Sequence, residues 1–69
     1  MTEDAAREHL RAVLDVFTAG TVLHLLAEVV REDGAEARRA GDERTADRCE
    51  DAAAALFVVG LGIDAALPQ

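Results

Sequence analysis

The feature that most constrains the fold is a run of small and apolar residues that repeats at alternating steps of three and four along the last third of the chain. The run comprises Ala46, Cys49, Ala53, Leu56, Gly60, Ile63 and Leu67. Because an α-helix completes a turn in about 3.6 residues, this spacing places them all on one stripe. The run therefore predicts a helix over about residues 43–66 that packs along its length against another helix.

The partner helix is predicted directly upstream, over about residues 19–40. Its apolar stripe consists of Val22, Leu25, Leu26, Val29 and Val30. Gly41 is suited to the left-handed conformation that ends a helix, and Asp42 is suited to cap the next one. Folding the chain back at Gly41 sets Leu26 opposite Leu56, so the apolar halves of the two helices meet. The two helices are thus expected to form a long antiparallel hairpin.

A shorter helix over about residues 3–17 is predicted to precede the hairpin. Its apolar face consists of Ala6, Leu10, Val13, Leu14 and Phe17. We expect a break after it, because Thr18 or Thr21 can cap a new helix. A continuous helix through Gly20 is the alternative, and a second break at Gly34 is also open because glycine costs a helix about 1 kcal/mol relative to alanine. The chain is predicted to be one all-α domain, residues 1–69.

Composition excludes several functional classes. Fifteen residues are Ala, aromatic residues make up 3% and there is no Ser. Fourteen acids face seven Arg and no Lys, and the net charge of −7 disfavours binding to nucleic acid. No arrangement of side chains suggests nucleophilic catalysis or a nucleotide loop. We predict neither enzymatic activity nor a cofactor nor a bound metal.

The distribution of apolar residues argues against a membrane protein. The most apolar stretch, residues 52–63, is twelve residues long and is flanked by Asp51 and Asp64. A membrane-spanning helix needs about 20 apolar residues. The segment Thr2-Glu3-Asp4 carries two acids and is unlike the basic start of a signal peptide. The expected location is the cytoplasm.

The chain is predicted to self-associate. A monomer of this size rarely gains more than about 3–5 kcal/mol from its own core, and a lone cysteine excludes an intrachain disulfide. At the base of the hairpin, around residues 56–63, apolar side chains surround the whole helix, so the first two helices are expected to cover only part of it. The predicted interface of a dimeric helical bundle consists of Leu56, Phe57, Val58, Leu61, Ile63 and Ala65.

The opposite end of the hairpin, the tip at residues 28–51, is strongly charged. Four basic residues flank the turn and form the predicted contact site for an unidentified protein partner: Arg38, Arg39, Arg44 and Arg48. Acids interleave with them, so a solvated mixed-charge face is the alternative interpretation.

The chain offers two further candidate chemical sites, a His–Glu pair and a lone cysteine. His24 and Glu28, four residues apart, could supply two metal ligands, but no second pair accompanies them. Cys49 is expected to be a small buried residue of the helix–helix seam rather than a reactive thiol, because neighbouring acids disfavour its thiolate.

The segment Ala46-Asp47-Arg48-Cys49-Glu50 resembles a stretch of the Rop family. The resemblance covers five residues, together with the small size, the acidity and a lone cysteine at the seam. It implies a helical hairpin that dimerises into a four-helix bundle and binds paired RNA loops. The extra first helix and the longer hairpin depart from that family.

The sequence thus predicts a small, acidic, homo-oligomeric helical module for protein–protein interaction, acting as an adaptor, an inhibitor or an antitoxin-like modulator without catalysis. The alternative is a Rop-like dimer that binds structured RNA through the Arg residues of the tip. A steep dependence of binding on salt would distinguish this alternative.

Overall fold

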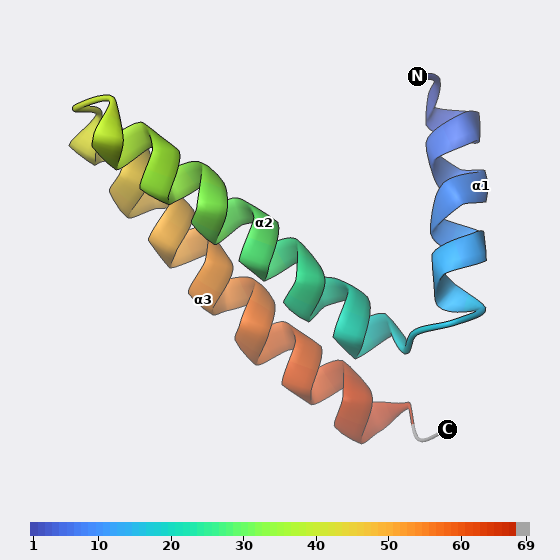
Figure 1. Ribbon diagram of the computed structural model, residues 1–69. Helices are drawn as coiled ribbons and strands as arrows, with labels where there is room; N and C mark the ends of the chain where they lie inside the picture. Colours follow the sequence, from blue (N-terminus) through green and yellow to red (C-terminus); the bar gives the residue numbers. More distant parts are fainter. Residues whose placement is uncertain (68–69) are drawn as a thin grey trace.

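The computed structural model describes residues 1–67 and consists of three α-helices, with no strand in that range (Figure 1). The helices are α1 (Glu3–Leu14), α2 (Ala19–Arg39) and α3 (Glu43–Ala66). The predicted all-α fold is confirmed. The bounds of α3 agree with the prediction, α2 ends one residue earlier, and α1 ends three residues earlier. Residues 68–69 of the predicted domain lie outside the described part.

The helix ends follow from local chemistry. Thr2, Thr18 and Asp42 each accept a hydrogen bond at their side-chain oxygen from a backbone N–H in the first turn of the helix they precede. Gly41 has a φ of 84°, a left-handed conformation that suits glycine at the end of α2. The predicted break before α2 is therefore present, and α2 runs through Gly34 without interruption.

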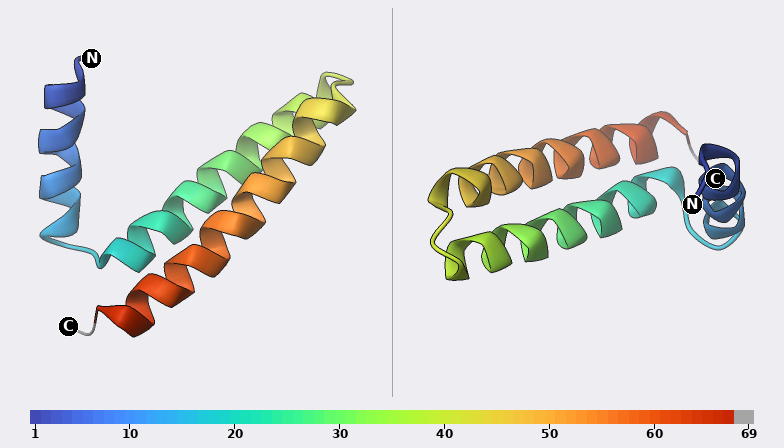
Figure 2. Two further views of the ribbon diagram at one scale, coloured as in Figure 1. Left: turned by 180° about the vertical axis from the view of Figure 1, so that it is seen from behind. Right: turned by 90° about the horizontal axis from the view of Figure 1, so that it is seen from above.

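Helices α2 and α3 lie side by side and antiparallel, as both views of Figure 2 show. Six small residues form the buried seam between them, and on each helix they recur every seven residues. They are Gly20, Ala27 and Gly34 on α2, and Ala46, Ala53 and Gly60 on α3. The predicted stripe of α3 is confirmed, because its remaining members up to Ile63 are half-buried between these positions.

The predicted stripe of α2 is wrong for three of its five residues, and the other two, Val22 and Val30, are half-buried. Leu25, Leu26 and Val29 were expected to face α3, but all three are exposed, Val29 by 51%. The reason is steric: the two backbones approach closely where neither carries a side chain beyond a methyl group. The face with the small residues therefore turns inward, and the larger aliphatic residues are left on the outside of α2.

Two glycines, Gly34 and Gly60, show how closely α2 and α3 approach each other. A Cβ atom added to Gly34 would lie 2.8 Å from Cβ of Cys49. One added to Gly60 would lie 2.8 Å from Cδ2 of His24 and 3.0 Å from the carbonyl oxygen of Gly20. The absence of a side chain at these positions lets the helices pack, which accounts for a glycine inside α2 despite its cost to helix stability.

Helix α1 stands away from the hairpin at its base, joined by residues 15–18 (Figures 1 and 2). Its axis and that of α2 are bent by 117°. Of residues Glu3–Leu14, none is buried. The backbone of α1 approaches α2 and not α3 within the described chain, so the expectation that it covers a side of α3 is wrong.

The molecule is extended and thinly packed. Its extents are 41 × 30 × 15 Å and its radius of gyration is 13.9 Å, whereas a compact chain of this length has about 11 Å. The buried apolar residues are Ala27, Ala46 and Ala53, and no large side chain within residues 1–67 is fully buried. The hairpin therefore gains stability from close contact of small residues over its length, not from a central core.

Asp42 makes part of this stability depend on pH. Hydrogen bonds from the side chain and then the backbone N–H of Thr45 lower the pKa of its carboxyl from the ordinary 3.8. A lowered folded-state pKa contributes stability above the unfolded-state pKa, and this stability is lost as pH falls through the folded-state pKa.

Asp42→Asn keeps a capping oxygen but removes the charge. We expect the variant to unfold at a lower temperature than the wild type at neutral pH, and the difference to shrink below the ordinary pKa of 3.8. Thermal unfolding followed by circular dichroism at several pH values measures this. A difference that stays constant at acid pH would show that the charge of Asp42 contributes nothing.

Candidate interaction surfaces

Arg38 joins the two helices at the tip. From the last turn of α2 its guanidinium pairs with Glu43, and it lies 3.4 Å from Oδ1 of Asp47 and 3.0 Å from Oε1 of Glu50, all on α3. The charge of Glu43, the hydrogen bond to Asp47 and the charge of Glu50 raise the pKa of Arg38. This predicted contact residue is thus engaged within the hairpin.

The other three tip arginines differ from Arg38. Arg39 pairs with Glu36 on its own helix, and both side chains are largely exposed. Arg44 and Arg48 form no ion pair within residues 1–67. The four arginines therefore differ in their ion pairs. Within the described chain, Arg44 and Arg48 are the two whose charges are free to pair with a partner protein.

The predicted interface residues of α3 fall into three groups. Leu56 and Ile63 are half-buried along the seam with α2. The ring of Phe57 stacks on His24, with ring centroids 4.7 Å apart. The remaining three are exposed and form what we call the outer face of α3: Val58, Leu61 and Ala65.

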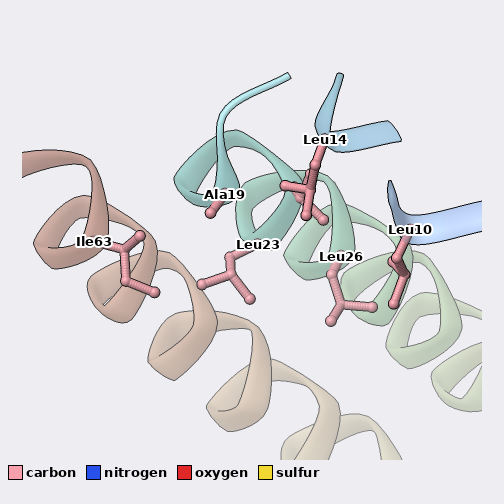
Figure 3. Close-up of a pocket in the computed structure, with 7 residues that line it drawn as sticks. Leu10, Leu14, Ala19, Leu23, Leu26 and Ile63 are labelled. Atoms are coloured by element: carbon pink, nitrogen blue, oxygen red, sulfur yellow. The ribbon is translucent and has the colours of Figure 1, made fainter. Parts of the chain in front are cut away.

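A surface that the sequence did not predict lies between α1 and α2. It is an open cleft of about 380 Å³, which we call the α1–α2 cleft, with aliphatic side chains along its whole lining (Figure 3). The lining residues are Leu10, Leu14, Ala19, Val22, Leu23, Leu26 and Ile63. A pair of aliphatic residues four apart on each side of the break, Leu10 with Leu14 and Val22 with Leu26, was the signal that could have revealed it.

The end of the hairpin next to this cleft is fixed by Asp64. Its Oδ1 accepts a hydrogen bond from the Thr18 hydroxyl at 3.0 Å, which ties the last turn of α3 to the N-cap of α2. The first turn of α2 has no acid of its own. Asp64 therefore supplies the negative charge that the positive end of the α2 dipole favours.

Cys49 and His24 are the remaining candidates for a chemical site. Cys49 is a free, half-buried thiol in the seam, as predicted. His24 has its Nε2 atom buried without a hydrogen-bond partner in the described chain. Within residues 1–67 no three His, Cys, Asp or Glu side chains gather in a way that could hold a metal ion.

No single helix among residues 1–67 has the length and apolarity to cross a membrane; α1 and α2 reach them only when taken together across their 117° bend. No protein-family model matches the chain, and comparison with curated proteins and with solved structures finds no match. What the surfaces bind must therefore be argued from their chemistry.

Proposed function

We propose that the chain is a small, acidic, homo-oligomeric helical module that binds another protein, as an adaptor, an inhibitor or an antitoxin-like modulator, and has no catalytic role. One observation carries the proposal. The chain exposes 5193 Å², about 1,000 Å² more than a compact monomer of 7.3 kDa does. Each partner in a standard protein interface buries about 800 Å², so the excess surface is of the size that one interface removes.

The chemistry of the exposed surface supports the same proposal. Large aliphatic side chains are exposed on all three helices, among them Leu14, Val29 and Val58. A hairpin whose buried apolar residues are three alanines gains little from its own core, and chains of this size commonly rely on self-association instead. A second copy of the chain would supply the missing contacts.

Self-association through the base leaves the tip free to meet a different protein. The tip, residues 28–51, holds nine acids and five Arg, and in the described part of the chain the charges of Arg44 and Arg48 are not engaged in ion pairs. Such a mixed surface suits a protein partner of mixed charge better than a phosphate backbone. The Rop-like alternative is weakened because Arg38, the arginine with the most contacts, already binds three carboxylates.

The first test is the mass of the full chain in solution. Sedimentation equilibrium at micromolar concentration should give at least twice the 7.3 kDa of one chain. A monomer throughout that range would contradict the proposed function.

The second test concerns the tip. Arg44→Glu combined with Arg48→Glu should weaken capture of a partner protein from a lysate of the source cells without changing mass or helix content. Arg38 is left intact, because it holds the two helices together. The matched control, Arg7→Glu with Arg11→Glu, makes the same change of charge on α1 and should leave capture intact. Loss of the oligomer in the tip variant would contradict this assignment.

A further inference from the structure

We propose that the α1–α2 cleft is the site of self-association, and that it is filled by α1 of a second copy, with each copy inserting its first helix into the cleft of the other. This inference rests on the proposed self-association and specifies its geometry. It moves the main contact away from the outer face of α3.

Helix α1 packs only in part against its own chain, because none of its residues is buried. Twelve residues form a helix about 18 Å long, and helices of that length are marginal in water without tertiary contacts. Its apolar face is continuous, yet Leu10, Val13 and Leu14 all remain exposed. Of the residues of α1, Leu10 and Leu14 line the cleft, whereas Val13 does not and is 36% exposed.

The α1–α2 cleft suits a helix as its occupant. It is concave, its lining comes from all three helices, and every lining residue is aliphatic (Figure 3). Along α2 the apolar surface continues past the cleft to Leu25 and Val29, both exposed. An amphipathic helix laid in an apolar groove is a common mode of recognition. By contrast, the outer face of α3 lies on one convex helix and cannot enclose a partner.

A second copy satisfies the requirements of symmetry and charge. A two-fold contact is self-complementary, and α1 is both a wall of the cleft and the helix to be inserted. Two chains of net charge −7 repel each other, but α1 itself carries three acids and two Arg. The arginines already pair on its surface, Arg7 with Asp4 and Arg11 with Glu8. The inserted helix therefore brings a net charge of only −1 to the contact, so most of the repulsion between the two chains lies outside it.

Complementation of two variants tests this geometry. Val13→Glu alters the inserted helix, and Leu26→Arg alters the cleft. In a reciprocal dimer each variant alone breaks both contacts, so its dimer Kd should rise by about a hundredfold. In an equimolar mixture one wild-type contact is restored and the other pairs Glu with Arg. The mixture should therefore bring the Kd back to within about tenfold of the wild type.

The outer face of α3 provides the control for this experiment. Val58→Glu, on the outer face of α3, should leave the dimer intact. If it abolishes the dimer while Val13→Glu does not, the outer face is the interface and this inference is overturned, although the proposed function stands. If the wild type is itself a monomer, the proposed function fails too. Should the single variants unfold, mixing must still restore both mass and helix content; no recovery overturns the inference.

Discussion

Gly60→Ala is expected to destabilise the protein, whereas Gly62→Ala, two residues further along the same helix, is expected to stabilise it. In a helix interior alanine is favoured over glycine by about 0.5–1 kcal/mol, and both positions gain this. At Gly62 a new Cβ would meet nothing within 4 Å. At Gly60 it would lie 2.8 Å from the ring of His24 and 3.0 Å from the backbone oxygen of Gly20.

The two contacts at Gly60 differ in how readily they yield. The His24 ring could turn only by giving up its stacking on Phe57, and the carbonyl of Gly20 could move only with the backbone of α2. Forcing a methyl group into a packed seam costs about 1–3 kcal/mol, which exceeds the gain in helix propensity. The net effect of Gly60→Ala is therefore a loss of about 1–2 kcal/mol.

Chemical unfolding of both variants at one fixed protein concentration measures the difference, because the stability of an oligomer depends on concentration. Equal stabilisation by the two substitutions would mean that the helices can separate at the base without cost. That result would remove close packing as the explanation for the glycine at position 60.

The comparison of α2 with α3 shows which part of the fold could be predicted from the sequence. On α3 the small and the large members of the repeat lie on one stripe, so the apolar pattern and the packing pattern coincide. On α2 they differ: the larger residues Leu25, Leu26 and Val29 lie on one face, and Gly20 and Ala27 lie on another. A rule based on hydrophobicity chooses the larger residues, while the geometry of close approach chooses the smaller ones.

The surfaces were harder to predict than the elements. The break at Thr18 could be predicted from capping chemistry, but the 117° bend could not, because it is set by four connecting residues and by the contacts of Leu10 and Leu14. The α1–α2 cleft depends on that bend. At the tip, Arg38 and not Arg44 joins the two helices. Which arginine does so depends on the side of α2 that faces α3, and the apolar pattern of α2 predicted that side wrongly.

Ala53→Leu is expected to destabilise the hairpin strongly, and Ala54→Leu almost not at all. Ala53 is 0% exposed at the middle of the seam, whereas Ala54, the next residue, is exposed. Leucine is nearly as good a helix former as alanine, so local propensity does not separate the two variants. The difference between them reports the packing of α2 against α3.

A leucine at position 53 leaves two outcomes for the seam. Either α3 moves away from α2 along several turns, which loses the contacts of Ala46 and Gly60 together, or the new side chain adopts a strained rotamer at a cost of about 1–3 kcal/mol. Against the roughly 3–5 kcal/mol available to so small a chain, either outcome removes a large share of its stability. Circular dichroism should show lost or steeply reduced helix content for Ala53→Leu at a temperature where Ala54→Leu remains folded. Equal helix content and equal stability of the two variants would contradict this prediction. The hairpin would then be stabilised by contacts of its aliphatic surface in the oligomer and not by the seam of glycine and alanine.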